Sequence, residues 1–241
     1  MSCYGPLAAW YDELTGDVPY SSFADFYENE FRANGGEFKL LLDLFCGTGT
    51  LTYIMAKRGY EMIAVDASED MLIQAREKSE DCILPPLFLC QEASELDLYG
   101  TVDAAFCSLD GINYIPPDEL PELFHRLQFF VRPGGLFIFD IRSSEWINSM
   151  DGQIYVDEQD DVLCLWRSEI VREENCIYYD MDIFSRKGKL WERSEEEHIE
   201  YIYEFEYLKK ALESEGFHNI RILEYGPQND LGRLNIIAER A

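Results

Sequence analysis

The 241-residue sequence lacks the features of several large protein classes. Its seven cysteines are an odd number with no C-x-x-C pair, so neither a disulfide framework nor a zinc site is predicted. No apolar run approaches the roughly 20 residues of a membrane span, and the first residues form no basic leader. We therefore expect a cytoplasmic protein with no membrane segment and no metal. Cys46, Cys90 and Cys107, in or just after strand-like runs, are interpreted as small apolar fillers.

Basic residues are also scarce. The chain has 20 Lys and Arg against 47 Asp and Glu, a formal net charge of -27, and such a field repels a polyanion. Nucleic acid is therefore disfavoured as a partner. Two interpretations of the acidity remain: it keeps the protein in solution, or it attracts a cationic substrate or a basic protein partner.

Only three histidines are present, and no two of them have the spacing of metal ligands. His125 falls within a predicted helix and His218 at the start of a predicted strand. Of the three, only His198 is considered as a general base, with a carboxylate such as Asp110 as the other type of base, although a surface histidine is favoured over that role.

Short apolar runs alternate with helix-period segments through the first half of the chain. Strands are predicted at 39–45, 60–66, 84–90, 102–109 and 135–141, and helices at 51–58, from 68 onward, and at 117–131. Such alternation is typical of βαβ units. It predicts a parallel sheet with helices on both faces.

The pattern changes after Trp146. Strand-like stretches at 154–156, 161–172, 176–186 and 189–201, the last three separated by REEN and RKGK turns, predict an antiparallel meander inserted into the α/β domain. A helix at 204–215 and strands at 218–225 and 233–239 follow.

The strongest chemical signal is the run LLDLFCGTGT at 41–50, an apolar strand that enters a glycine turn and opens a helix. Asp66, at the tip of the second strand, is placed to accept hydrogen bonds from both hydroxyls of a ribose. The third glycine of a dinucleotide fingerprint is replaced by Thr52, which disfavours NAD. Asp43 precedes the glycines, where its carboxylate can hold the turn's N–H groups or, through water, a cationic amino group.

The DLFCGTGT segment resembles motif I of the class I S-adenosylmethionine (SAM) dependent methyltransferases. YDELTGDVPY, CQEASELDL and SLDGINYI add a similarity to small bacterial methyltransferases with an inserted antiparallel sheet. The resemblance implies an α/β Rossmann-like, doubly wound, seven-stranded and mostly parallel sheet with a final antiparallel strand, plus the inserted meander. It divides the chain into an N-terminal helical lid (1–36), a SAM-binding core (37–150), the inserted β region (151–202) and the last helix and two strands of the core (203–241).

The same resemblance implies a set of cofactor contacts. Asp43, Gly47 and Gly49 surround the methionine part of SAM, Asp66 holds the ribose, and Ala67 and Met71 pack on the adenine. Gln91, Glu92 and Ala93 match the position at the adenine edge, with Glu92 in place of the usual Asp and a solvated acidic loop as its alternative. The set is completed by Cys46, Thr48, Ser108 and Leu109, and by Tyr11 and Tyr20 of the lid, whose rings suit a sulfonium cation.

Candidates for contact with the methyl acceptor are Asp110, Asn113, Tyr114, Trp166 and His198, with helix capping and ordinary packing as alternatives for the first three. The segment at 109–114 lacks the [D/N]-P-P-[Y/F/W] motif of enzymes that methylate amino groups of nucleic-acid bases. Four aromatic residues at helical spacing, Phe23, Phe26, Tyr27 and Phe31, predict a stripe that faces the core.

These observations predict in-line methyl transfer from SAM, with S-adenosylhomocysteine (SAH) as product, to a small-molecule or protein acceptor. The alternatives are a non-catalytic SAM or nucleoside-binding regulator and an NAD-dependent oxidoreductase. The meander is expected either to cover the acceptor pocket or to form a homodimer surface.

Overall fold

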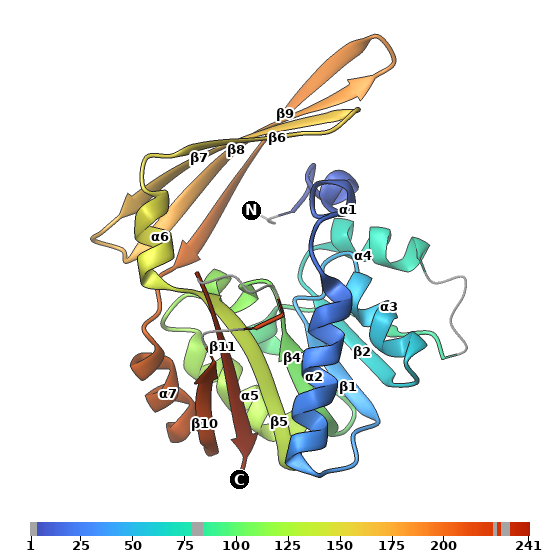
Figure 1. Cartoon of the computed structure of the whole chain (residues 1–241), viewed down its shortest axis with the longest axis vertical. Helices are drawn as coiled ribbons and strands as arrows, with labels where there is room; N and C mark the ends of the chain where they lie inside the picture. The colour runs from blue at the N-terminus through green and yellow to red at the C-terminus, as the bar shows by residue number, and fades with distance from the viewer. Residues whose placement is uncertain (1–3, 79–83, 224–225, 228–231) are drawn as a thin grey trace.

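Two β-sheets organise the residues that the computed structural model describes, which are 4–78, 84–223, 226–227 and 232–241 (Figure 1). The larger sheet has seven strands in the order β10-β11-β5-β4-β1-β2-β3. Their bounds are β1 Leu40–Leu44, β2 Glu61–Asp66, β3 Leu87–Cys90, β4 Val102–Cys107, β5 Val131–Arg142, β10 Phe217–Leu223 and β11 Arg233–Arg240. Only β11, the final strand, runs antiparallel to its neighbours. The predicted Rossmann-like fold is confirmed.

The helices are α1 Tyr11–Leu14, α2 Tyr20–Asn34, α3 Thr50–Lys57, α4 Glu69–Glu77, α5 Leu120–Phe130, α6 Ser144–Met150 and α7 Phe205–Ser214, with short 3-10 turns at Ala8–Trp10, Ala93–Glu95 and Gly111–Tyr114. Capping residues define several of the helix ends, and Gly35, with a φ of 77°, ends α2. Ser68, for example, accepts a hydrogen bond from the Met71 N–H and so begins α4.

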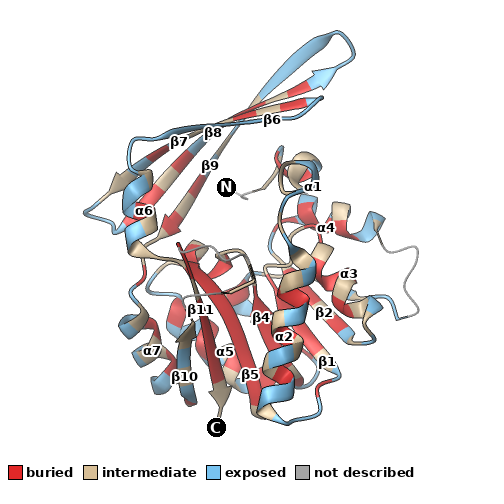
Figure 2. Ribbon diagram, viewed as in Figure 1, coloured by how far each residue is buried: buried red, intermediate tan, exposed pale blue. Residues whose placement is uncertain are grey.

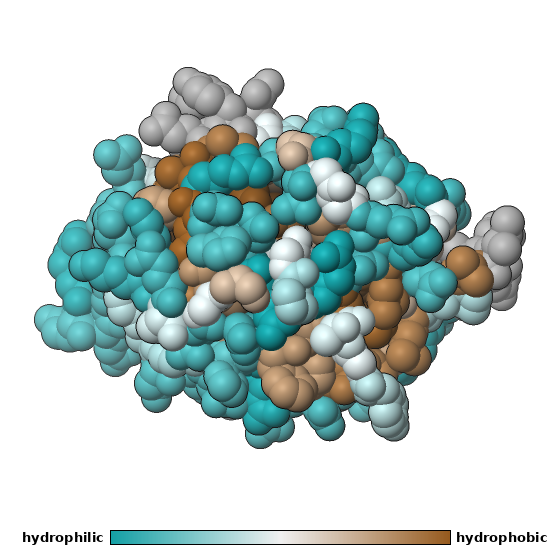
Figure 3. Space-filling model, turned by 90° about the horizontal axis from the view of Figure 1, so that it is seen from below, coloured by the Kyte–Doolittle hydropathy of each residue, from teal (hydrophilic) through white to brown (hydrophobic). Residues whose placement is uncertain are grey.

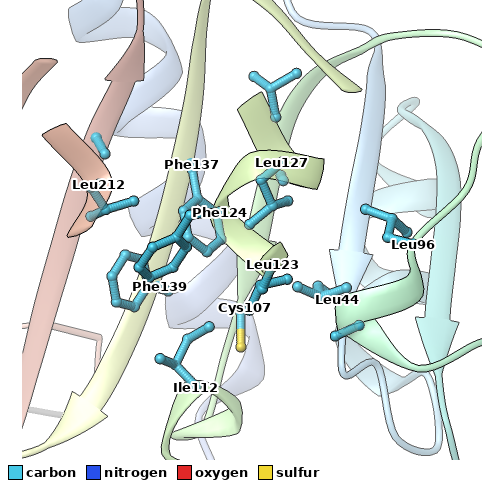
Figure 4. Packing of buried hydrophobic residues seen from close by; sticks show 14 of the residues in the cluster. Leu44, Leu96, Cys107, Ile112, Leu123, Phe124, Leu127, Phe137, Phe139 and Leu212 are labelled. Carbon is cyan, nitrogen blue, oxygen red and sulfur yellow. The ribbon is translucent and has the colours of Figure 1, made fainter. Parts of the chain in front are cut away.

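The two faces of the large sheet carry separate hydrophobic clusters. Helices α2 and α3 cover one face, where Phe23, Tyr27 and Phe31 of the predicted stripe are buried and Phe26 is partly buried. Helices α5 and α7 cover the other, and there Phe124, Phe137 and Phe139 gather between α5 and β5 (Figure 4). The central strands are buried almost throughout (Figure 2), because helices cover both faces of the sheet.

The smaller sheet is the predicted meander, with β6 Ile154–Glu158, β7 Val162–Val171, β8 Cys176–Lys187 and β9 Leu190–Tyr201 paired in that order. It projects beyond the large sheet near the N-terminal segment (Figure 1). Its apolar face packs around Leu7 and Ile147. The N-terminal segment is therefore part of the packing between the two sheets.

The opposite end of the molecule, seen in Figure 3, is mostly hydrophilic with scattered apolar areas. Cys90 is exposed, so its prediction as an apolar filler was wrong, because it ends the edge strand β3, whereas Cys107 on the central strand β4 is buried. The last two residues of the strand predicted at 218–225 lie outside the described residues.

Candidate functional site

A cavity of about 310 Å³ lies at the carboxyl ends of β1, β2 and β4, where ligands bind in open α/β sheets. Of the residues selected from sequence, its lining includes Tyr11, Tyr20, Asp43, Cys46, Gly47, Thr48, Asp66, Ala67, Met71, Glu92, Ser108, Leu109 and Tyr114. Residues that the sequence reasoning missed also line it, among them Tyr4, Phe45, Ser68 and Glu119. The structure thus brings together segments from five different parts of the chain.

The glycine turn after β1 is left-handed at three positions. Phe45, Gly47 and Gly49 have φ angles of 58°, 53° and 72°. A Cβ at Gly49 would lie 3.2 Å from Ala75 and Phe88, so glycine is required there for packing under the turn. A Cβ at Gly47 would meet nothing within 4 Å, which leaves the backbone open to the cavity.

Asp66 is held rigidly at the end of β2. Its Oδ2 accepts a hydrogen bond from the Gly47 N–H and its Oδ1 one from the Ser68 N–H, both at 2.8 Å. Each oxygen keeps a second lone pair, so the carboxylate can still accept two hydroxyl groups from a ligand. Burial raises the pKa of Asp66 above its ordinary value.

Asp43 is buried inside β1, with 3% of its surface exposed. The Thr52 hydroxyl donates to its Oδ2 at 2.5 Å. Burial nevertheless dominates and raises the pKa of Asp43 to about 7. A cation bound in the cavity would stabilise the ionised form of this carboxyl group.

The N-terminal segment is fastened over the glycine turn. Asp12 accepts hydrogen bonds from the hydroxyls of Thr48, at 2.5 Å, and Thr50, at 3.2 Å, and it also forms an ion pair with Lys78. Tyr11 and Tyr20, which begin α1 and α2, consequently face the cavity from the lid side.

The loop after β4 carries two adjacent non-glycine residues with positive φ, Leu109 at 59° and Asp110 at 58°. The backbone N–H groups of both donate to Asp140, at 3.0 Å each. Arg233, which is 3% exposed, pairs with Asp140 and, at 2.5 Å, with Asp110. A buried ion-pair cluster thus holds this loop in a left-handed backbone conformation. Strained backbone of this kind is concentrated at binding and active sites.

Beyond the glycine turn, the cavity wall is aromatic. The Tyr4 and Tyr114 hydroxyls are 2.8 Å apart, and the Tyr114 hydroxyl lies 3.1 Å from Nδ1 of His198. His198 is fully buried on β9, so the surface position favoured for it was wrong. Burial lowers its pKa to about 4, which makes it a neutral imidazole at neutral pH.

Several other candidates lie outside the cavity lining. Gln91 hydrogen-bonds to the backbone of Asp97, and Ala93 is packed in the core. The Asn113 amide donates to the carbonyl of Tyr201 and accepts from the N–H of Arg142, so it ties the loop to β9 and β5. Trp166 of β7 packs edge-on against Tyr179 of β8 within the meander.

The anchor of the N-terminal segment on the meander had no sequence signal. Glu196 accepts hydrogen bonds from the N–H groups of Gly5, at 2.6 Å, and Leu7, at 2.9 Å. The Ser68 hydroxyl donates to the Tyr4 carbonyl at 3.0 Å. This segment therefore bridges the glycine-turn side and β9.

The described segments of the chain lack two further features. No cluster of three or more His, Cys, Asp or Glu in these segments is arranged to hold a metal ion. In the same segments, no helix has the length and apolarity needed to cross a membrane.

Comparison with known proteins gives a consistent result. A family model described as a methyltransferase domain matches residues 41–135. The chain is 29% identical over 222 residues to YqeM of Bacillus subtilis, whose methyltransferase assignment is provisional, and the match covers 91% of this chain and 88% of that protein.

The solved structures agree. A SAM-dependent methyltransferase from Clostridium acetobutylicum superposes with a TM-score of 0.85 at 28% identity and full coverage of both chains. The sugar N-methyltransferase KedS8 from Streptoalloteichus superposes with a TM-score of 0.83 at 18% identity, covering 100% of this chain and 94% of that one. The latter similarity concerns the fold.

Proposed function

We propose that this chain is a class I SAM-dependent methyltransferase that transfers the methyl group of SAM to a small-molecule acceptor enclosed between the glycine turn, the N-terminal segment and the loop after β4. The observation that carries the proposal is one cavity lined by Asp43, Gly47 and Asp66 on one side and by Tyr4 and Tyr114 on the other. The first group suits a cofactor with an amino acid and a ribose, and the second leaves room for an acceptor.

The residues of the cavity fit SAM group by group. Asp66 would accept the ribose hydroxyls with its free lone pairs, and Asp43 would balance the charge of the ammonium group. The open space at Gly47 would receive the methionine part. Ala67 and Met71 would pack on the adenine, and Glu92 would meet its edge.

The remaining lining residues would close the site. Cys46, Thr48, Ser108 and Leu109 would surround the cofactor, and Tyr11 and Tyr20 would cover it from the lid. SAM supplies an electrophilic methyl carbon on a sulfonium, so the protein's task is to align the acceptor and exclude water.

A small molecule is favoured over a protein side chain because the N-terminal segment lies across the site. Glu196 fastens this segment to β9 and Ser68 fastens it near the cofactor side. A bulky acceptor would have to displace both anchors. Methylation of a sugar amine by the fold neighbour KedS8 is consistent with an acceptor of this size.

The first experiment is thermal unfolding of the purified chain with SAM, SAH, NAD or no ligand. A ligand at 100 times its dissociation constant should stabilise the fold by about 2.7 kcal/mol. We expect SAM and SAH to raise Tm and NAD to leave it unchanged. The rise should be lost in Asp66→Ala and kept in Glu77→Ala, which removes an exposed carboxylate from α4.

The second experiment measures SAH formation with small-molecule acceptors. Binding of SAM with no SAH formed from any acceptor would favour a non-catalytic SAM-binding regulator. A rise in Tm with NAD alone would contradict the proposal and support the oxidoreductase alternative.

A further inference from the structure

A buried polar layer lies directly behind the aromatic wall of the cavity. Tyr114 lines the cavity, and its hydroxyl lies 2.8 Å from that of Tyr4 and 3.1 Å from Nδ1 of His198, with the carboxylate of Glu200 close enough for Tyr114 to lower the pKa of that carboxyl group. His198 is 0% exposed and Glu200 is 6% exposed, on neighbouring inward positions of β9. Tyr114 is thus the point where the cavity meets these two groups.

Two buried polar atoms of this layer lack hydrogen-bond partners in the part of the chain that the structure describes. Among the described residues, Nε2 of His198 and Oε2 of Glu200 have no hydrogen-bond partner. Leaving one buried polar atom unpaired costs about 1–3 kcal/mol, and such groups in a folded protein call for an explanation. A role in moving a proton provides one, because a proton acceptor needs a free lone pair.

The two groups differ in how well they can hold a proton. Burial lowers the pKa of His198 to about 4, so its imidazole is a weak base. Burial and the nearby Asp110 raise the pKa of Glu200 to about 8, far above that of an ordinary glutamate. A base whose pKa lies near the working pH is the most effective one. Glu200 is therefore better suited to receive a proton than His198.

We propose that Tyr114 meets the nucleophilic atom of a protonated amine acceptor and that Glu200, behind it, takes up the proton that the amine must lose. The inference rests on the proposed methyltransferase function and adds the chemical class of the acceptor to it. Glu200 is a positioning residue, since it touches Tyr114 and not the acceptor.

The step balances without a further reactant. The ammonium group gives one proton to the Tyr114 oxygen while the Tyr114 hydroxyl proton moves to the Glu200 carboxylate. The freed nitrogen lone pair then forms the N–CH₃ bond as the C–S bond of SAM breaks, and its electron pair stays on the sulfur of SAH. Tyr114 is left neutral, Glu200 is protonated, and the product amine carries one positive charge.

Charged and titratable groups from several elements surround Glu200 and will shape its titration. They are Asp110 and Tyr114 of the loop after β4, Arg142 of β5, Arg233 of β11, Tyr179 of β8, Tyr4 of the N-terminal segment and His198 of β9 itself. The two arginines favour the ionised carboxylate, and Asp110 opposes it. A cationic amine in the cavity would favour the ionised carboxylate of Glu200 in the same way as the arginines do.

The test uses three amines, each paired with its hydroxyl analogue: glucosamine with glucose, ethanolamine with ethylene glycol, and glycine with glycolate. SAH formation at saturating SAM is measured from pH 6 to 9.5. We expect turnover of at least one amine and none of its hydroxyl partner. For that amine, kcat/KM should rise with pH and level off near pH 8.

Glu200→Gln and Tyr114→Phe each break the proposed path. Each should lower kcat by about 100-fold at pH 7, which is the usual size of a general-base effect. The deficit should shrink toward pH 9.5, because more of the amine is then already deprotonated. Glu197→Gln, an exposed position on the outward face of β9, is the matched control and should keep the wild-type profile.

A readout independent of turnover is the pH dependence of Tm. Glu200 has a folded-state pKa of about 8, above its unfolded value, so its contribution to stability is lost as the pH rises through 8. Glu200→Gln cannot ionise. The variant should therefore gain Tm relative to wild type between pH 6 and pH 9.

The outcomes separate this inference from the proposed function. If SAM raises Tm but no amine is turned over, or a hydroxyl analogue reacts as fast as its amine, the amine proposal is wrong and the cofactor site stands. If Glu200→Gln and Tyr114→Phe lose the same factor at every pH, their role is structural and the inference fails. If SAM does not bind, both proposals fail.

Discussion

The ionisation of Asp43 should control how tightly the cofactor's amino acid portion binds. This carboxyl group has a pKa of about 7 in the free protein because it is buried. An ammonium group nearby favours the ionised form, so affinity must fall once the carboxyl group is protonated. At pH 5.5 only about 3% of a group with that pKa is ionised, which predicts a loss of up to about 30-fold in affinity relative to pH 8.

Calorimetric titration of SAH from pH 5.5 to 8 measures this loss. The control ligand is 5′-methylthioadenosine, which keeps the adenosine and the sulfur but lacks the amino acid part with its ammonium group. Contacts of Asp66 with the ribose are common to both ligands, so the titration of Asp66 cancels in the comparison. We expect affinity to fall with decreasing pH for SAH and to change much less for 5′-methylthioadenosine.

Asp43→Asn keeps the shape of the side chain and its hydrogen bond with Thr52 but cannot ionise. In this variant the two ligands should show the same weak pH dependence. If the wild-type protein already binds SAH and 5′-methylthioadenosine with equal pH dependence, Asp43 does not face the ammonium group, and the assignment of the methionine end of the cavity is wrong.

Three further predictions concern the framework of the site. Arg233→Met leaves two buried carboxylates without their main partner, so we expect a loss of about 3–5 kcal/mol in the free energy of unfolding, measured in urea. Gly49→Ala combines a φ of 72° with contacts at 3.2 Å and should cost about 1–2 kcal/mol, whereas Gly100→Ala, with nothing within 4 Å, should be nearly neutral in the same assay. Glu196→Ala removes both hydrogen bonds that anchor the N-terminal segment, so bound SAH should dissociate about tenfold faster in stopped-flow experiments; an unchanged rate would show that this segment does not retain the ligand.

The cofactor side of the cavity could be predicted from sequence because its signals are local. A strand, a glycine turn and a helix follow one another within the run 40–57, and Asp66 ends the next strand in parallel register. The positive φ angles at Gly47 and Gly49 favour glycine through local backbone sterics alone. The residues on this side of the cavity could therefore be selected from sequence, because neighbours in the chain set their geometry.

The acceptor side could not be predicted in the same way. The inward positions of β9 are polar, with Ser194, Glu196, His198 and Glu200 alternating along the strand. Hydrophobic periodicity is the main sequence signal for a buried strand face, so such a pattern predicts an exposed one. Burial of His198 instead comes from the N-terminal segment and the loop after β4, both more than 80 residues away in the chain.

This difference between the two sides has a functional meaning. A strand face lined by carboxylates and a histidine costs stability when buried, and here Glu196 is held by contacts with Gly5 and Leu7 and His198 by a contact with Tyr114. The polar groups of β9 and the segment that covers them thus depend on each other. A change in acceptor preference within this fold would accordingly require changes in the N-terminal segment and in β9 together, while the glycine turn and its two aspartates remain the same.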